Sequence, residues 1–308
     1  MRYELLRLLR EKGDRVSGEA LSRELGVSRV SVWKSVRELS AAGYDISATS
    51  RGYFLVSSPD VLLPGEFPGW EDRVHHLDEV DSTMIVARDL ARKGAVHGTL
   101  VTAERQTGGR GRLERSWFSP KGGIYMTLVT RPSVAAGMAP RINLLSAVAV
   151  ASAVESLHGI SARVKWPNDV LVDGKKLCGI LAEMEAEMDA VRFVNIGVGL
   201  NANVQITDAF PDAVSLSQLL GHDVNRRLLA REVVEGILRR LQCVQSADIL
   251  DEWRCYAHTL GRRVSIATGN TAVEGLAIDI DDFGALLVKR DDGTLMTVVA
   301  GDCTHRTD

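Results

Sequence analysis

The sequence predicts an α+β protein of three parts: a small helical domain with a β-hairpin, a central domain built on a mixed sheet, and a small all-β domain at the C-terminal end. Three observations lead to this prediction. Residues 1–56 combine helical apolar patterns with helix-stopping glycines. Residues 74–257 alternate short apolar runs with helical patterns. From residue 258 onward, short β patterns are separated by glycine-containing turns, as in a small barrel.

Three short helices are predicted at the start of the chain. Ser17 and Ser28 are predicted to cap the second and third helices, because a serine hydroxyl can accept the free backbone N–H groups there. Glycines are predicted to end the three helices, at positions 13, 26 and 43. Residues 44–56 then alternate and turn at Arg51-Gly52, as a hairpin would. Helix, glycine-containing turn, helix and β-wing form the winged helix-turn-helix arrangement, predicted over residues 1–57.

The predicted third helix has the composition of a DNA-recognition helix. Its exposed face carries basic and small polar side chains and no acidic residue before Glu38. Residues 1–56 hold ten Lys/Arg and seven Asp/Glu, whereas the rest of the chain holds 27 and 33. A small helical domain that binds protein is the alternative, and the acid-free face favours DNA. The predicted DNA contacts are Ser28, Arg29, Ser31, Lys34 and Arg51.

Composition indicates a soluble protein of a reducing cytoplasm. The sequence has no stretch near the roughly 18 uninterrupted apolar residues that span a bilayer, and no signal-peptide pattern at its start. No membrane partner is therefore expected. The four cysteines are widely spaced, which argues against a disulfide framework and against structural zinc.

The central domain, predicted over 74–257, follows a proline-rich segment at 58–73 that is predicted to be a linker. Apolar runs predict strands at 98–103, 124–129 and 193–199. Longer helical patterns predict helices over Ile142–Leu157 and Arg226–Cys243.

A glycine- and arginine-rich segment from Gln106 to Trp117 is the sharpest local signal. Glycines at 108, 109 and 111 let the backbone approach a ligand closely, and arginines at 110, 112 and 115 bring guanidinium groups to the same place. Such a loop can wrap an anion. A mobile, solvated surface loop explains the composition equally well.

A second signal is Lys165, which ends a predicted strand and is followed by Trp166-Pro167-Asn168-Asp169. Its ammonium can stand beside phosphate or carboxylate oxygens, and Asp169 can hold a turn or a metal-bound water. An ordinary surface lysine is the alternative. Two further segments follow: residues 174–183, a turn into a strand, and residues 197–203, where glycines precede Asn201.

Together and in this order, these segments resemble the biotin protein ligase family. The matching pieces are Asp81-Ser82-Thr83, the 106–117 loop, Lys165 to Asp169, Lys176-Leu177 with the following Gly-Ile-Leu, and the Gly-x-Gly-Leu-Asn that ends at Asn201. The N-terminal winged helix resembles the bifunctional branch, in which the ligase also represses biotin-synthesis genes. The resemblance implies a central ligase domain of the biotin/lipoate type and an SH3-like C-terminal barrel over 258–308.

What the resemblance implies chemically is two-step acyl transfer, with biotin and ATP as substrates and Mg²⁺ as the metal. Biotin is first activated to biotinyl-5′-AMP and then passed to a lysine of a carrier protein. Lys165 and Arg112 are the predicted catalytic residues, with Asp169 a candidate for the metal. The predicted biotin-binding residues are Ser82, Thr83, Met84, Gln106, Arg110, Gly111, Arg112 and Lys165. The predicted ATP and adenylate contacts are Arg110, Arg112, Lys165, Lys176 and Asn201.

One departure concerns position 84, where the family usually has asparagine and this chain has Met84. The expected partners are a biotin carboxyl carrier protein, operator DNA and a second copy of the chain in a ligand-induced homodimer. A lipoate-attaching ligase shares the fold and the adenylate chemistry, and the Gly-Arg-Gly-Arg loop and the DNA-binding domain favour biotin over it. A transcription factor that only senses the ligand is the rival from another class, and the presence of Lys165 and Arg112 argues against it.

Overall fold

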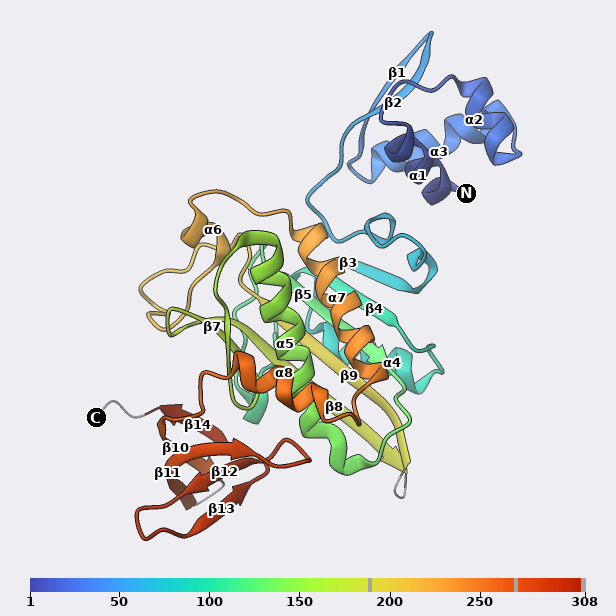
Figure 1. Ribbon diagram of the computed structural model, residues 1–308. Helices are drawn as coiled ribbons and strands as arrows, with labels where there is room; N and C mark the ends of the chain where they lie inside the picture. The colour runs from blue at the N-terminus through green and yellow to red at the C-terminus, as the bar shows by residue number, and fades with distance from the viewer. Residues whose placement is uncertain (188–189, 269–270, 306–308) are drawn as a thin grey trace. The chain divides into compact units, whose positions relative to one another are not determined.

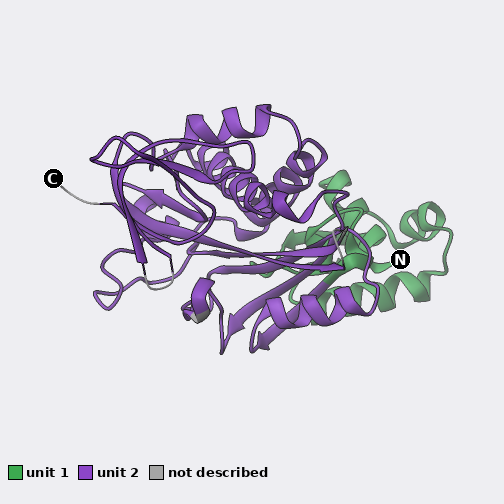
Figure 2. Ribbon diagram, turned by 90° about the horizontal axis from the view of Figure 1, so that it is seen from below, with its two compact units in different colours: residues 1–74 green, residues 75–308 purple. Residues whose placement is uncertain are grey.

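A computed structural model describes residues 1–187, 190–268 and 271–305 of the chain. These residues form two compact units, Met1–Val74 and the remainder from His75, which Figure 2 colours separately. The predicted C-terminal domain ends with residues 306–308, which lie outside the described residues. Each unit is described by itself.

The first unit has the predicted winged helix-turn-helix elements, α1 (Arg2–Lys12), α2 (Gly18–Leu25) and α3 (Arg29–Ala41), followed by the hairpin β1 (Asp45–Thr49) and β2 (Gly52–Ser57) (Figure 1). Both predicted serine caps are present. The Ser17 hydroxyl accepts a hydrogen bond from the Ala20 N–H, and the Ser28 hydroxyl accepts one from the Ser31 N–H. The predicted leucine stripe of α1 is buried in the core of this unit, which confirms the fold predicted for the N-terminal domain.

Part of the segment predicted to be a linker packs onto the winged helix. A 3₁₀ turn at Pro64–Glu66 buries the Glu66 carboxylate. Its Oε1 accepts hydrogen bonds from Arg10 Nη2 at 2.7 Å and from Tyr44 Oη at 2.6 Å. Burial and the neighbouring Glu66 carboxylate raise the pKa of the Tyr44 hydroxyl, so that it stays protonated as a donor. Glu66 therefore ties this segment to α1 and to the start of the hairpin.

The second unit is built on a seven-stranded sheet in the order β3-β4-β5-β9-β8-β7-β6. Its long central strands pair antiparallel, β5 with β9 and β9 with β8. The strands are β3 (Val74–Val80), β4 (Thr99–Gln106), β5 (Ile124–Thr130), β6 (Arg163–Lys165), β7 (Asp169–Val172), β8 (Lys175–Glu187) and β9 (Ala190–Leu200). The three strands predicted from apolar runs are therefore confirmed as β4, β5 and β9.

Helices cover both faces of this sheet (Figures 1 and 2). Helices α5 (Ala139–His158), α7 (Arg226–Gln242) and α8 (Asp248–Tyr256) pack together on one face, and α4 (Thr83–Arg92) covers the other. A short helix, α6 (Leu216–Leu220), precedes α7. By length and composition α5 could cross a membrane, but most of it is buried inside this unit, as in the core helix of a soluble protein.

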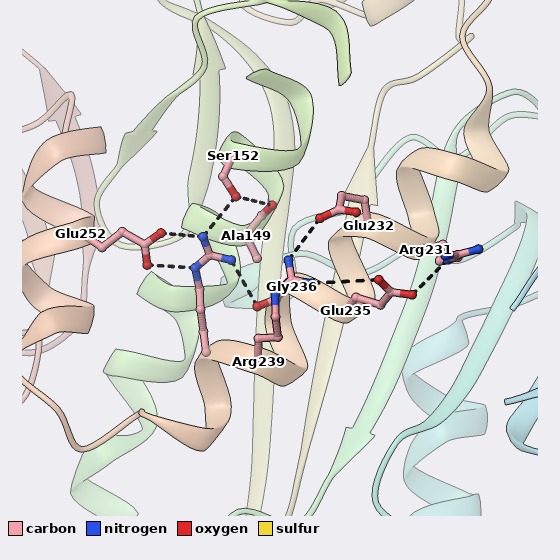
Figure 3. Close-up of polar contacts among 9 residues, drawn as sticks. Ala149, Ser152, Arg231, Glu232, Glu235, Gly236, Arg239 and Glu252 are labelled. Carbon is pink, nitrogen blue, oxygen red and sulfur yellow. Dashed lines mark hydrogen bonds and ion pairs between the residues drawn. The ribbon is translucent and has the colours of Figure 1, made fainter. Parts of the chain in front are cut away.

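Arg240 holds the three helices of this layer together. Its guanidinium donates to both carboxylate oxygens of Glu252 on α8, at 2.5 and 2.9 Å, and to the Ser152 hydroxyl on α5 at 3.2 Å (Figure 3). Such forked arginine–carboxylate pairs fix geometry as well as charge. The exposed side of α7 carries further ion pairs, among Arg231, Glu232, Glu235 and Arg239 (Figure 3).

The end of the chain forms the predicted small all-β domain. Its five strands run antiparallel in the order β13-β12-β11-β10-β14. They are β10 (Arg263–Thr268), β11 (Thr271–Ile280), β12 (Leu286–Lys289), β13 (Leu295–Val298) and β14 (Asp302–His305). Buried side chains of the sheet domain bind backbone carbonyls of the 282–284 turn: Arg141 Nε donates to Asp282 O at 2.5 Å, and Trp166 Nε1 donates to Gly284 O at 3.1 Å. The turn between β11 and β12 is therefore fixed to the larger sheet domain.

A histidine pair lies where β14 meets the sheet domain. The rings of His258 and His305 are 5.2 Å apart, and Thr259 Oγ1 lies 3.2 Å from His305 Nε2 while accepting a hydrogen bond from the Trp166 N–H. Burial lowers the pKa of His305 to about 4, and the positive charge of Lys165 acts in the same direction.

We expect this histidine to weaken the fold in acid. The unfolded chain takes up a proton at this side chain near pH 6.5, whereas the folded chain resists it down to about pH 4, so stability falls as pH drops through this window. Urea unfolding followed at pH 7.5 and pH 5 should show a smaller loss of stability in His305→Asn than in the unchanged chain. Equal losses would contradict the prediction.

Candidate functional site

A cavity opens in the second unit where several segments of chain meet. It lies against the start of α4, the end of β4, the 106–117 loop, β5, the start of β7, β8, β9 and the start of β14. Among the predicted site residues, its lining contains Ser82, Thr83, Met84, Gln106, Arg110, Gly111, Arg112, Asp169 and Lys176. Residues that are 220 positions apart in sequence, from Ser82 to Asp302, thus face one space.

One end of the cavity carries uncharged hydrogen-bonding groups. The backbone N–H and the hydroxyl of Thr83 both donate to Gln106 Oε1, at 2.9 and 3.1 Å. Gln106 Nε2 donates to the Ser119 hydroxyl at 3.0 Å, which fixes the orientation of the amide. The Ser82 hydroxyl is buried and has no hydrogen-bond partner among the described residues. The Ser82 hydroxyl can therefore pair with a neutral polar group of a ligand that binds at this end.

The glycine- and arginine-rich loop closes on itself above this end. Gly111 N–H donates to Arg115 O at 2.7 Å, and a Cβ on Gly109 would stand 2.5 Å from Trp117 O, so the close approach requires glycine. Arg112 Nη1 reaches out of the loop to Asn168 Oδ1 at 3.2 Å and to Gly301 O at 3.0 Å. Arg115 pairs with Asp302 of β14. The C-terminal domain therefore supplies one wall of the site.

The opposite end of the cavity carries positive charge. Lys176 Nζ lies 2.7 Å from Asp169 Oδ1 and 5.4 Å from the centre of the Trp117 ring. Burial lowers the pKa of Arg112, and the carboxylates of Asp169 and Asp302 oppose that shift. Four cationic side chains, Arg110, Arg112, Arg115 and Lys176, thus line the cavity beside the carboxylates of Asp169 and Asp302, and this arrangement suits a phosphate or carboxylate ligand.

Two predicted residues do not line this cavity. Lys165, predicted as the catalytic lysine, lies at the end of β6, opposite Asp169 of β7, which does line the cavity. Burial, and with it the charge of Lys165, lowers the pKa values of His258 and His305. Asn201 is buried and donates from Nδ2 to Val214 O at 3.2 Å, which holds the segment after β9 in place. Lys176, the second residue of β8, lines the cavity.

Sequence reasoning missed several lining residues. Gly179 and Gly199 seat the indole of Trp117, since a Cβ on either would stand 3.0 Å or less from its ring. Glycine at 197 and 199 was a usable signal, because alternate strand residues share one face. Asp302 carried no signal, since its place at the cavity depends on the packing of a separate domain.

The first unit presents its own candidate site on α3 and the hairpin turn. Arg29, Lys34 and Arg51 are exposed, and the Arg37 guanidinium stacks 4.9 Å from the exposed Trp33 ring. Ser28, a predicted DNA contact, uses its hydroxyl to cap α3 and stands at the exposed end of that helix. The described residues of α3 therefore present a basic face that suits phosphate and base-edge contacts.

Comparison with known proteins agrees with both sites. Family models match residues 2–54 as an HTH domain, 77–201 as the biotin/lipoate A/B protein ligase family, and 259–306 as the biotin protein ligase C-terminal domain. The bifunctional ligase/repressor BirA of Bacillus subtilis is 39% identical over 310 residues, which cover 95% of each chain. The chain belongs to the biotin protein ligase family.

Other members of the biotin protein ligase family agree over most of the chain. The bifunctional ligase/repressor BirA of Escherichia coli is 29% identical and covers 96% of this chain, and 94% of its own length is matched. The biotin protein ligase of Aquifex aeolicus in complex with biotin and ATP is 27% identical, with a TM-score of 0.65 over 76% of this chain and 99% of that one. The Leishmania major enzyme in complex with biotinyl-5-AMP has a TM-score of 0.53 at 26% identity, over 74% of this chain and 98% of that one.

Proposed function

We propose that this biotin protein ligase joins biotin to a lysine of biotin carboxyl carrier protein, using ATP, and that the same chain represses transcription in response to biotin. The observation that carries the proposal is the cavity, which is lined by uncharged hydrogen-bonding groups, among them the unpartnered Ser82 hydroxyl, and by four cationic side chains. The uncharged ureido ring of biotin suits the uncharged groups, and the reacting carboxylate and phosphate suit the cations.

The reaction proceeds in two steps, adenylyl transfer followed by acyl transfer. A biotin carboxylate oxygen attacks the α-phosphorus of ATP, pyrophosphate leaves, and biotinyl-5′-AMP remains. The carrier lysine amine then attacks the acyl carbon and gives up a proton to solvent, AMP leaves with the bonding electron pair, and an amide forms. Both transition states gather negative charge on oxygens that Arg112, Lys165 and Lys176 can stabilise.

The cavity fits a magnesium ion that arrives with the nucleotide. Asp169 and Asp302 bring two carboxylates to its wall, and Mg²⁺ in nucleotide sites is held by one or two carboxylates together with substrate phosphates. When bound, the ion would neutralise charge on the phosphates. Asp169 also holds the Lys176 ammonium in place through their ion pair.

The remaining roles are assigned by position. Ser82, Thr83 and Gln106 bind the ureido ring, while Arg110, Gly111 and Arg112 close over the acyl phosphate. We propose Lys165 and Arg112 as the catalytic residues, and the Lys176 ammonium beside Asp169 as a further cation for the phosphates. The test of the enzyme is transfer of radiolabelled biotin to an acceptor domain with ATP and Mg²⁺, run beside lipoate. Incorporation of lipoate but not biotin would contradict the proposal.

Repression requires DNA contacts on the first unit and a change caused by the ligand. We propose that Arg29, Ser31, Lys34 and Arg51 contact a two-fold operator, with Ser28 at the start of the recognition helix, and that a cytoplasmic homodimer forms when biotinyl-5′-AMP orders the 106–117 loop. Analytical ultracentrifugation with and without biotinyl-5′-AMP tests the coupling. An association constant that the ligand leaves unchanged would refute it.

A further inference from the structure

Asn195 is an unexplained polar side chain in the middle of β9. It is 0% exposed, and neither its Oδ1 nor its Nδ2 has a hydrogen-bond partner among the described residues. An unpaired amide in a protein interior costs free energy, so buried amides are normally bound on both atoms. Both polar atoms of the Asn195 side chain are therefore available to a ligand that can reach them.

The position of Asn195 places it next to the floor of the cavity. Alternate residues of a strand point to the same face, and Gly197 and Gly199, further along β9, both line the cavity. On the neighbouring strand β8, Leu181 pairs with Gly197 and lines the cavity, and Glu183 pairs with Asn195. Asn195 thus stands one step beyond the floor, on the same face of the sheet.

Met84 stands over that floor. It is 4% exposed, lines the cavity, and its Sδ lies 2.7 Å from the point where a Cβ on Gly197 would be. Methionine is unbranched and adapts readily to a new neighbour, so this side chain can move without disturbing the backbone.

We propose that Asn195 recognises the ureido ring of biotin once Met84 has moved aside. An amide has both a donor and an acceptor, as the N–H and C=O groups of a ureido ring require. The inference rests on the proposed function. It makes Asn195 a residue that determines specificity, in addition to Ser82, Thr83 and Gln106.

Asn195→Leu tests the proposal because it should move stability and affinity in opposite directions. Leucine has similar size and removes an unpaired buried amide, so the melting temperature should stay the same or rise. Calorimetry should show biotin binding weakened about ten-fold, since a ligand group loses its partner. Binding of the diamine analogue of biotin, which lacks the ureido carbonyl, should change less than about three-fold, since that contact is absent from it.

Asn143→Leu is the matched control. Asn143 lies in α5, its Oδ1 is also buried without a partner among the described residues, and it does not line the cavity. This variant should bind biotin like the unchanged chain. Met84→Asn added to Asn195→Leu should recover most of the lost affinity, because an amide returns to the cavity.

Two results would overturn the inference: biotin affinity unchanged in Asn195→Leu, as when the amide is satisfied by a buried water, or equal losses for biotin and its diamine analogue. Should the leucine variant fail to fold, Asn195→Ser replaces it with the same expected loss of ureido discrimination. An unchanged chain that binds no biotin would contradict the proposed function itself, which separates the two failures.

Discussion

Replacing Lys176 by alanine should reduce ATP–pyrophosphate exchange by about 100-fold or more, which is the usual effect of removing one preorganised group that stabilises transition-state charge. Lys176 lines the cavity, with its Nζ 2.7 Å from Asp169 Oδ1 and beside the Trp117 ring, so it can contact phosphate oxygens there. The loss should appear mainly in kcat, because the contact strengthens as charge develops.

Lys165→Ala is the second test at this site. It removes the ammonium proposed as catalytic, so ATP–pyrophosphate exchange should be lost. The change should also raise the pKa values of His258 and His305, which burial lowers most and the charge of Lys165 lowers further. Near-normal exchange in Lys165→Ala, with exchange lost in Lys176→Ala, would move the catalytic assignment to Lys176.

Arg226→Met should destabilise the fold by about 3–5 kcal/mol, the effect expected when one partner of a buried ion pair is removed. The Arg226 side chain is 4% exposed and lies 2.9 Å from Glu104 Oε2, whose side chain is 10% exposed. Arg226 also donates to Gly123 O at 2.8 Å, and so joins the start of α7 to the strands that carry the cavity. Urea unfolding measures the loss.

Adding Glu104→Gln to Arg226→Met should restore part of that stability, because the buried negative charge disappears with its partner. Surface ion pairs provide the contrast. Arg231→Ala, which removes a pair at 45% and 35% exposure, should change stability by less than about 1 kcal/mol. A loss under about 1 kcal/mol in Arg226→Met would show that water reaches this pair and screens it.

Local signals in the sequence were sufficient to predict many of the helices and strands, but not to predict every contact of the site. Serine caps and glycine stops predicted α1 to α3 because helix ends depend on residues within one turn. Apolar alternation predicted β4, β5 and β9. The helix α4 was missed: it has few polar residues to mark its ends, and its Ser82 N-cap makes no side-chain cap hydrogen bond.

The place of Lys176 beside Asp169 shows where sequence reasoning is limited. Lys176 lies in a recognisable segment, but the pairing of β7 with β8 is what brings it to Asp169. Likewise, Asp302 reaches the cavity because Arg141 and Trp166 fix the C-terminal domain to the sheet domain. Such long-range packing leaves no periodic trace in the chain.

The carboxylate of Glu66 decides where the DNA-binding part of the chain can be separated from the rest. A fragment that stops at residue 57 would retain Arg10 and Tyr44 but lose the acceptor they share, and it would expose apolar surface where Leu63 packs on the core. A fragment that continues to Val74 keeps that acceptor and the 3₁₀ turn that carries it. The longer piece is therefore the one to purify for operator-binding measurements, and the shorter one should aggregate.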